Sequence, residues 1–310
     1  MSMMIQSGRF GDGGGPTPPP LVSATNWRIS VLRNAYSEFA SVVNTAFAEI
    51  EMRLTPGGAD QCTGGSQNNS GSLSGFSGNN AFDNNTGTWW VASGTAPWWI
   101  QYTHSSPRQI REFALTGRND EFTGDGPTEF KIQTNDGSLN DFYTFRTGPW
   151  GPGEVRVFNV DTFVEQPGRF IRLRPTGVHG GTGNRFSCAK VEFRTSIGGA
   201  DICTGGVAFS REYQSGNLPA NAFDATLSTR YSARISGGFP NNYIGYHLPT
   251  AIGQDVVQVA LTCRNDTFGP SEAPTGFLVE YGIGNIWTLL WQETGIPGWT
   301  AGETKVFTKP

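Results

Sequence analysis

GADQCTGG (Gly58–Gly65) recurs in this chain as GADICTGG (Gly199–Gly206). Three more phrases return in the same order: NAFD (Asn80–Asp83) at Asn221–Asp224, ALTGRND (Ala114–Asp120) as ALTCRND (Ala260–Asp266), and EVRVF (Glu154–Phe158) as ETKVF (Glu303–Phe307). Each returns about 140–150 residues later, whereas short solenoid repeats have periods of about 20–50 residues. The sequence therefore predicts a tandem duplication of one whole domain.

Length and composition agree with two domains that are rich in turns. A chain of 310 residues suits about two ordinary domains. It has 42 glycines, 19 prolines and only 15% charged residues, which indicates short strands joined by turns. The net charge of -4 comes without any basic run, so we expect no nucleic-acid partner. No long apolar run predicts membrane insertion, and the N-terminus lacks the pattern of a signal peptide.

Short alternating segments follow one another between the repeated phrases. Examples are WWIQY (Trp98–Tyr102), EFKIQTND (Glu129–Asp136) and EVRVFNV (Glu154–Val160), and no convincing helix separates them. A two-residue alternation broken by turn residues is typical of antiparallel strands. The sequence thus predicts an all-β fold of two tandem sandwiches, at residues 55–197 and 198–310.

The second copy stops before two strands that the first copy still has. FIRLR (Phe170–Arg174) and KVEFR (Lys190–Arg194) have no later counterpart, but WRISV (Trp27–Val31) and AEIEMR (Ala48–Arg53) stand at the front of the chain. A sandwich short of two strands leaves open edges. We therefore predict that residues 26–54 form a strand pair that completes the C-terminal sandwich, by circular permutation within the chain or by strand donation to a neighbouring subunit. The alternative is a separate helix or hairpin beside a truncated second domain.

The repeated phrases are similar to the discoidin family, the coagulation-factor type C domains, whose relatives include galactose-binding-like carbohydrate-binding modules. The matching phrases are NAFDNNTGTWW (Asn80–Trp90), PWWIQY (Pro97–Tyr102), SPRQIREFALTGRND (Ser106–Asp120), PTEFKIQTNDG (Pro127–Gly137) and AKVEFR (Ala189–Arg194). The resemblance covers residues 59–194 and, more loosely, residues 200–310. It implies a discoidin-like jelly-roll β-sandwich for each copy. Because this fold hosts lipid, sugar and protein binders, the resemblance specifies no single ligand.

The resemblance also implies a structural calcium ion in each domain, held by the loop around an A-x-D motif and by a Glu of the last strand. Such a hard cation prefers several oxygen ligands. Carried over by position, the ligands of the first domain are Ala81, Asp83, Asn85, Thr88, Ala189 and Glu192. Those of the second are Ala222, Asp224, Thr226 and Thr229, with Ala48 and Glu51 from the N-terminal strand pair. The alternative is that each Asp only caps its own turn.

A glycan site is the second candidate. Carbohydrate sites combine an aromatic platform with polar groups at loop tips. The candidates are Trp90, Trp98, Arg118, Asn119, Asp120 and Phe122, together with Arg264, Asn265, Asp266 and Phe268 in the second copy. Strand alternation predicts that Trp90 faces outward and that Trp89 lies in the core. The alternative, which we favour, is that the Arg and Asp of each RND triplet lock their loop, since a site tuned to one ligand seldom repeats unchanged.

No motif in the sequence predicts catalysis. The three histidines are scattered, and no nucleophile elbow, zinc motif, P-loop or dinucleotide fingerprint is present. No pair of carboxylates is placed for glycoside hydrolysis. We therefore expect a protein without enzymatic activity.

Tandem domains of this texture resemble those of bacteriophage virion proteins and related gene-transfer particles. The join Ala48–Gly65 is similar to phage structural sequences, and residues 1–25 are predicted to form a flexible Gly- and Pro-rich arm. Such an arm is either a disordered tail or an anchor. We hypothesise a virion structural or attachment protein (phage tail, fibre adaptor or head spike), assembled in the bacterial cytoplasm. It would dock on other virion proteins through its arm, form a homo-oligomer and contact cell-surface glycans. The alternative is a carbohydrate-binding adhesin or binding module outside a virion.

Overall fold

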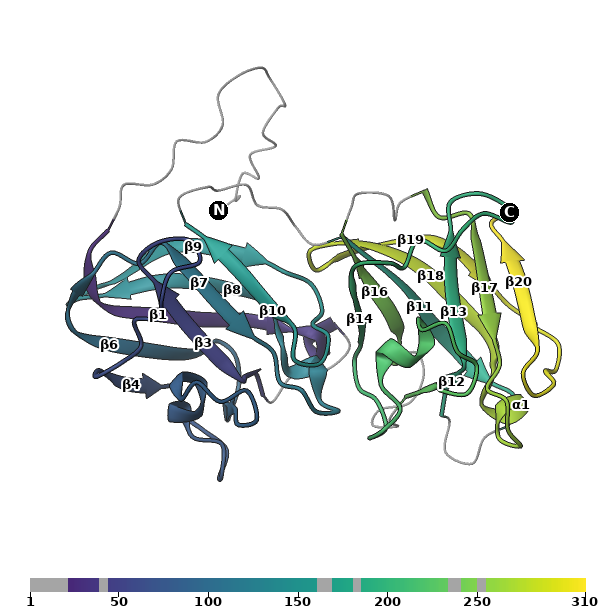
Figure 1. The fold of residues 1–310 in the computed structure, drawn as a ribbon, viewed down its shortest axis with the longest axis horizontal. Coiled ribbons are helices and arrows are strands. Elements are labelled where there is room, and N and C mark those ends of the chain that lie inside the picture. The colour runs from purple at the N-terminus through teal and green to yellow at the C-terminus, as the bar shows by residue number, and fades with distance from the viewer. Residues whose placement is uncertain (1–21, 39–43, 161–168, 181–184, 234–240, 250–254) are drawn as a thin grey trace, which may run out of the picture.

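The computed structural model describes residues 22–38, 44–160, 169–180, 185–233, 241–249 and 255–310. It is all-β, with two similar groups of antiparallel sheets that lie side by side (Figure 1). Each group places a five-stranded sheet opposite a three-stranded sheet around its own apolar core. We call residues 22–160 the first sandwich and residues 169–310 the second sandwich. No helix in the described ranges is long and apolar enough to cross a membrane.

The described part of the first sandwich contains two main sheets and one short strand pair. Its five-stranded sheet has the order β4 (Ser66–Asn69), β6 (Trp98–Arg108), β1 (Ala24–Asn34), β8 (Pro127–Asn135) and β9 (Leu139–Arg146). Its three-stranded sheet has the order β10 (Val155–Asn159), β7 (Glu112–Thr116) and β3 (Glu49–Arg53). The short pair joins β2 (Ala46–Phe47) to β5 (Trp90–Val91), and the 3₁₀ turns are η1 (Ala35–Glu38), η2 (Gly78–Phe82) and η3 (Thr123–Asp125).

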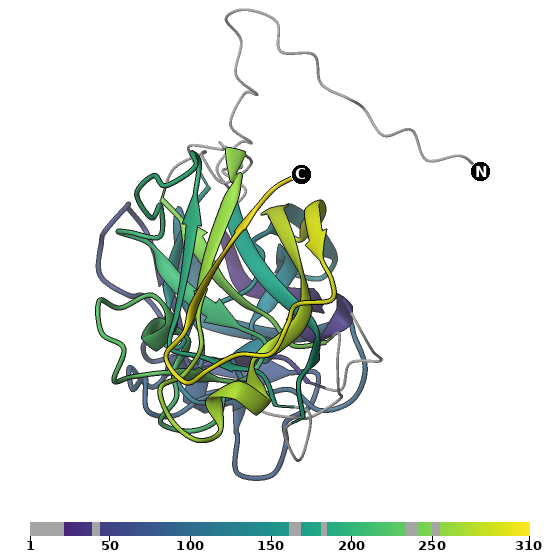
Figure 2. The ribbon, with the colours of Figure 1, turned by 90° about the vertical axis from the view of Figure 1, so that its right-hand side faces the viewer.

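The second sandwich repeats this plan. Its five-stranded sheet has the order β14 (Val207–Ser210), β16 (Ile244–Leu248), β11 (Arg169–Val178), β18 (Pro274–Ile283) and β19 (Ile286–Glu293). Its three-stranded sheet has the order β13 (Lys190–Arg194), β17 (Gln258–Thr262) and β20 (Thr304–Thr308). A short pair joins β12 (Ser187–Cys188) to β15 (Tyr231–Ser232), and the helical turns are η4 (Pro219–Ala222) and α1 (Gly269–Glu272). Figure 2, which faces the far side of this sandwich, shows β20 (yellow) in front.

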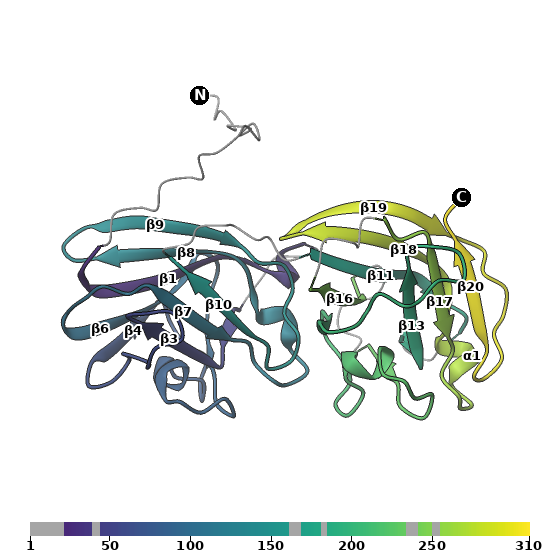
Figure 3. The same cartoon turned by 45° about the horizontal axis from the view of Figure 1, so that its top comes forward.

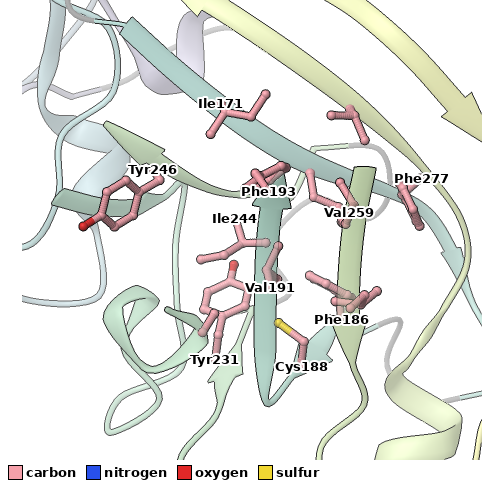
Figure 4. Close-up of a cluster of buried hydrophobic side chains, with 14 of the residues drawn as sticks. Ile171, Phe186, Cys188, Val191, Phe193, Tyr231, Ile244, Tyr246, Val259 and Phe277 are labelled. Atoms are coloured by element: carbon pink, nitrogen blue, oxygen red, sulfur yellow. The ribbon is translucent and has the colours of Figure 1, made fainter. Parts of the chain in front are cut away.

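Strand alternation builds both cores. In β1, Trp27, Ile29 and Val31 are fully buried, whereas the residues between them face the outside of the sheet. In the second sandwich, Val191 and Phe193 of β13 point into the core that Ile171 of β11 also enters (Figure 4). Successive residues of a strand face opposite sides, so this pattern needs only the two-residue period already visible in the sequence.

The predicted partner of the N-terminal strand pair is wrong. β1 pairs with β6 and β8, and β3 pairs with β7, so residues 24–53 complete the first sandwich rather than the C-terminal one. The second sandwich is completed by β11, which pairs with β16 and β18, and by β13, which pairs with β17. Both copies are therefore complete, and each begins with its own closing strands. The domain boundary falls between residues 160 and 169 instead of at residue 198.

Cross-strand polar pairs explain this choice of partners. Glu280 of β18 accepts hydrogen bonds from Arg172 and Arg174 of β11, with Nε–O distances of 2.7 and 3.0 Å. In the first sandwich, Ser30 of β1 donates instead to the amide oxygen of Gln133 of β8 at 2.5 Å. Exchanging the two closing strands would place Ser30 where Arg174 stands and take one guanidinium away from the buried carboxylate of Glu280. The loss of a charged partner inside a protein is costly, so each closing strand stabilises its own sandwich.

The outer face of the second five-stranded sheet packs against the first sandwich. Figure 1 shows β14, β16 and β11 on the side next to the first sandwich, and β13, β17 and β20 on the far side. Phe170, Phe209 and Tyr243 form a fully buried apolar cluster on this outer face. At its border, Nδ1 of His247 lies 3.1 Å from the carboxylate of Glu154 in the first sandwich. The two sandwiches thus share a packed boundary.

Candidate functional site

The RND triplet of the first sandwich follows β7 and is closed on itself. Nε and Nη2 of Arg118 donate to the two carboxylate oxygens of Asp120, each at 2.5 Å, and Nη1 donates to Asp125 at 2.6 Å. Arg118 is only 6% exposed. Burial opposes the charge of Arg118, but the two carboxylates outweigh it and raise the pKa of the guanidinium. These contacts describe a clamp that holds the loop.

The second sandwich repeats the clamp. Nη2 of Arg264 donates to Asp266 and Nη1 donates to Glu272, both at 2.5 Å. A bidentate or doubly paired guanidinium fixes a loop in one geometry because its N–H groups form a rigid fork. The favoured alternative, loop locking, therefore agrees with both copies. What remains at each loop tip is an exposed asparagine, Asn119 or Asn265, and a phenylalanine beside the guanidinium.

The two loop tips differ in what covers them. In the first sandwich the backbone carbonyl of Glu121 accepts the Tyr213 N–H at 3.3 Å, and the Gly124 N–H donates to the Arg211 carbonyl at 2.8 Å. The first loop therefore lies in the boundary between the sandwiches. In the second sandwich, Phe268 at the equivalent tip is 59% exposed.

The predicted aromatic platform lies mostly in the core. Trp90 and Trp98 are fully buried, so the expectation that Trp90 faces outward is wrong. Trp90 belongs to β5, stacks on Phe47 of β2 at 6.2 Å, and donates its indole N–H to Ser72 Oγ at 3.1 Å. Trp89 is the partly exposed member of the pair and stacks on Phe76. The alternation was assigned one residue out of register, which turns every side chain to the other face.

The loop after η2 gathers the first set of predicted calcium ligands. Asp83 Oδ1 accepts the Asn85 N–H at 2.9 Å and Oδ2 accepts the Thr88 hydroxyl at 2.7 Å, while Ala81 is buried beside them. In the second sandwich, Asp224 accepts the Thr226 N–H at 3.0 Å and the Thr229 hydroxyl at 2.7 Å, next to buried Ala222. Each Asp therefore caps its turn, as the alternative predicts. The carboxylate oxygens of each Asp lie beside the turn and accept hydrogen bonds within it.

The glutamates assigned to these loops are engaged elsewhere. Because the closing strands belong to their own sandwiches, Ala48 and Glu51 lie in the sandwich of Asp83, and Ala189 and Glu192 lie in that of Asp224. Glu51 pairs with Arg53 at 2.6 Å, and Glu192 pairs with Lys190 at 2.6 Å. The assignment of Glu51 to the second site and of Glu192 to the first is therefore wrong.

Glu49 is the carboxylate that reaches the Asp83 loop. It precedes Glu51 by one two-residue step on the same face of β3, which packs beside η2, and it is 3% exposed. Its Oε2 accepts the Asn85 N–H at 3.1 Å. Burial raises the pKa of Glu49 to about 7, with a further contribution from the charge of Asp83. The equivalent residue of the second sandwich is Lys190, a charge reversal within the phrases AEIEMR and AKVEFR that marks the position in the sequence.

The donor set near Glu49 fits a hard cation only in the first sandwich. Glu49, Asp83 and Asn85 supply carboxylate and amide oxygens, and buried Glu49 beside the exposed carboxylate of Asp83 gains from a neutralising cation. In the second sandwich the ammonium group of Lys190 takes the place of the Glu49 carboxylate. Within the described ranges no group of three or more His, Cys, Asp or Glu side chains gathers, so backbone carbonyls would have to complete any site.

One family comparison matches part of the chain. Residues 61–189 match the F5/8 type C domain. The match assigns a discoidin domain to this range, and such a domain implies binding of a carbohydrate or another ligand. No curated protein and no solved structure matches the chain.

The matched range of this discoidin domain crosses the structural boundary. It begins in the body of the first sandwich and ends at Ala189, between β12 and β13 of the second. The family order therefore places the closing strands after the body, whereas here the strands that close each sandwich precede it.

Proposed function

We propose that this protein is a non-enzymatic glycan-binding attachment protein whose contact loop is the tip of the second sandwich at residues 265–268. The observation that carries the proposal is the exposure of Phe268 beside the locked Arg264–Asp266 pair, within a discoidin-like fold. An exposed aromatic ring on a rigid loop offers a stacking surface for a sugar, and exposed Asn265 adds an amide donor and acceptor next to it. The equivalent loop of the first sandwich packs against the second sandwich, and Phe122 at its tip is only partly exposed.

The loop around Phe268 lacks the groups through which the equivalent loop of the first sandwich contacts the second sandwich. In the first sandwich the joint uses the Thr123 hydroxyl, which donates to the Ser210 carbonyl at 2.9 Å, and the Gly124 N–H. After Phe268 the first of these positions is occupied by Gly269, which has no hydroxyl, and the second by Pro270, which has no N–H group. This supports a ligand, rather than another sandwich of the same kind, as the partner of Phe268.

A glycan array followed by titration calorimetry tests the proposal. Phe268→Ala is expected to lower the affinity for a bound glycan about tenfold or more, while Phe122→Ala, the matched change in the covered loop, leaves it unchanged. Thermal unfolding of both variants checks that the fold persists. Equal affinity of the Phe268→Ala variant and the wild type would remove this loop from the proposal.

A structural calcium ion in the first sandwich is part of the proposal. Glu49 and Asp83 would hold it, with Asn85, Thr88 and the carbonyls of Ala81 and Ala48 as further ligands. Calcium would neutralise buried Glu49 together with exposed Asp83 and stiffen the loop. Support comes from the hydrogen bond between the Asn85 N–H and Glu49 and from the raised pKa of Glu49.

We further propose that the protein acts as a virion component, docked on other virion proteins through residues 1–25 and assembled as a homo-oligomer. Most of this arm lies outside the described residues. The basis for the role is the resemblance of Ala48–Gly65 to phage structural sequences. Detection of the chain in purified particles, and its loss from them when residues 1–21 are deleted, tests the role. A binding module outside a virion is the alternative, and absence of the chain from all particles would favour it.

A further inference from the structure

The outer faces of the two five-stranded sheets carry an arginine at the same position. Tyr102 and Tyr246 mark this equivalence, because the hydroxyl of each accepts a glycine N–H at the start of its domain body, from Gly65 at 2.9 Å and from Gly206 at 3.0 Å. One step along from these tyrosines, Arg28 of β1 pairs across the sheet with Gln101, and Arg172 of β11 pairs with Gly245. Arg28 and Arg172 are therefore counterparts.

In the second sandwich this position binds a carboxylate that comes from outside the domain. Arg172 is fully buried, and its guanidinium carbon lies 3.7 Å from the centre of the Trp287 ring. The guanidinium donates to both carboxylate oxygens of Glu38 in the first sandwich, at 2.5 and 2.8 Å. Gly245 leaves room for the Phe209 ring, since a Cβ there would come within 2.4 Å of it. The face is apolar around one guanidinium.

In the first sandwich the same face is polar and partly exposed. Asn26 stands in place of Phe170, exposed Asn68 in place of Phe209, and Trp99 in place of Tyr243, by the register of the two sheets. Amides link these residues: the Gln101 amide donates to Asn26 at 3.0 Å, and the Asn135 amide donates to Gln101 at 2.9 Å. In Figure 3 this sheet includes β6, β4, β1, β8 and β9 of the first sandwich.

Arg28 has no acid partner within the described parts of the chain. Its Nε and Nη2 donate to the Gln101 side-chain oxygen at 3.2 and 3.1 Å, and its guanidinium lies 3.9 Å from the centre of the Trp99 ring. Burial lowers the pKa of Arg28, whereas carboxylate partners raise the pKa of Arg172 against the same effect. The guanidinium is thus fixed in direction by Gln101 and Trp99 but not neutralised.

We propose that the outer face of β4, β6, β1 and β8, centred on Arg28 and Trp99, binds an acidic glycan and places a sugar carboxylate on the Arg28 guanidinium. The inference rests on the proposed glycan-binding function and adds a second, chemically distinct site. The counterpart Arg172 shows that a guanidinium at this sheet position binds a carboxylate from outside its own domain. Amide groups of Asn26, Asn68 and Asn135 border the arginine, as hydroxyl-rich ligands require.

The polarity of the face favours a glycan over a protein partner. The centre of a protein interface is depleted in charge and rich in packed aromatic groups, which describes Phe170, Phe209 and Tyr243 in the second sandwich. In the first sandwich the corresponding surface is built mainly from amides, and Trp99 is the only large aromatic side chain among these equivalent positions. The carboxylates at its edge, Asp136 and Asp141, accept hydrogen bonds from Asn26 and Gln133. A polar ligand with a carboxylate matches this surface better than an apolar protein patch.

An array of sialylated and uronic-acid glycans, each printed beside its carboxyl-reduced form, tests the proposal with the full chain. We expect the wild type to bind an acidic glycan and not its reduced form. Arg28→Gln is expected to weaken this binding at least about tenfold. Arg28→Lys keeps the charge and loses the planar fork, so it is expected to weaken binding less. Raised salt should also weaken it, because the contact is between charges that solvent can reach.

The outcomes separate this site from the loop at Phe268. Loss of acidic-glycan binding in Arg28→Gln but not in Phe268→Ala supports the sheet site, provided that both variants unfold at the wild-type temperature. If Arg28→Gln is unstable, the Arg28→Lys variant and the salt dependence decide. Unchanged binding in the folded Arg28 variants, with loss in Phe268→Ala, overturns the inference and leaves the proposed function intact. Equal displacement of the glycan by a polyglutamate peptide also overturns it, in favour of a protein carboxylate. Absence of any glycan binding overturns both.

Discussion

Glu38 and Arg172 form an ion pair across the boundary between the two sandwiches. Glu38 lies on the 3₁₀ turn that follows β1, and its Oε1 is 2.5 Å from Nη2 of Arg172 in β11. Arg172 is fully buried and also pairs with Glu280 at 2.7 Å. A guanidinium taken out of water needs such partners, so the pair ties the orientation of the second sandwich to the first.

Glu38→Gln is expected to destabilise this boundary. The variant keeps a hydrogen-bonding group but leaves Arg172 with one carboxylate, and we expect the free energy of unfolding to fall by about 1–2 kcal/mol, given the partial exposure of Glu38. Urea denaturation followed by tryptophan fluorescence measures the change. Arg33→Ala is the matched control, because Arg33 is 64% exposed and lies 3.6 Å from Glu129; its effect should stay within about 0.5 kcal/mol. Equal stability of Glu38→Gln and the wild type would show that the pair contributes nothing.

The boundary is also expected to weaken in acid through Glu154. Burial opposes its ionisation, but Arg156 and His247 hold the pKa of Glu154 at about 2 in the folded chain. Because this value is below the ordinary value of 4.5, the stabilisation is present above pH 4.5 and is lost as the pH falls toward 2. The expected loss is on the order of 2–3 kcal/mol.

Denaturation curves of the wild type and Glu154→Gln between pH 6 and pH 2.5 check this expectation. The variant should be less stable at pH 6 and should lose less stability on acidification, because the amide that replaces the carboxylate does not titrate. Parallel pH profiles for the two proteins would contradict the role given to Glu154.

Calcium is expected to act on the first sandwich through Glu49. The pKa of Glu49 is raised to about 7, so the stability associated with its neutral form is complete below pH 4.5 and is lost as the pH rises through 7. Without calcium, Glu49→Gln should therefore stabilise the protein at pH 8, by on the order of 1–3 kcal/mol. With calcium, the wild type should gain stability and the variant should not.

The second sandwich supplies a matched control for calcium. Lys190 occupies the position of Glu49, so Asp224→Ala should leave the calcium response unchanged, while Asp83→Ala abolishes it. Differential scanning calorimetry at pH 8 with and without calcium measures both. A calcium response that survives in Asp83→Ala would place the ion elsewhere.

Much of the local structure was predictable from the sequence. The two-residue alternation of WRISV and AEIEMR indicated strands, and β1 and β3 occupy these segments. The repeat of the RND phrase indicated a folding device, and the clamps of Arg118 and Arg264 have the same form. These features depend on neighbours close in the chain, which the sequence displays directly.

The partner of each closing strand could not be predicted in the same way. The order of closing strands and bodies along the chain is compatible with closure by the strands before a body or by those after it. The choice depends on long-range pairs such as Arg174 with Glu280 and Ser30 with Gln133, more than 100 residues apart. Counting the strands that follow each body as its closing strands therefore gave the wrong closure, and with it the wrong loop for Glu51.

The two candidate sites failed for different reasons. Trp90 rather than Trp89 entered the core, because a one-residue step turns a side chain to the other face. Glu49 rather than Glu51 met the Asp83 loop, although both lie on the same face of β3, because Glu49 lies one two-residue step earlier along the strand. Phe268 is exposed and Phe122 is only partly exposed because the first loop packs against the other sandwich, and no local pattern in the sequence encodes that packing. The sequence therefore gives no sign that Phe122 is partly covered while Phe268 is exposed.

Closure of each sandwich by its preceding strands underlies every site described above, and the fragment of residues 22–160 tests it most directly. Expressed alone, this fragment should fold and unfold in one cooperative transition, because it contains β1, β3 and the whole first core. The fragment of residues 59–194, which follows the family order, should lack that transition, since β11 does not provide the partners of β6 and β8. A stable, cooperative 59–194 fragment together with an unfolded 22–160 fragment would contradict the account.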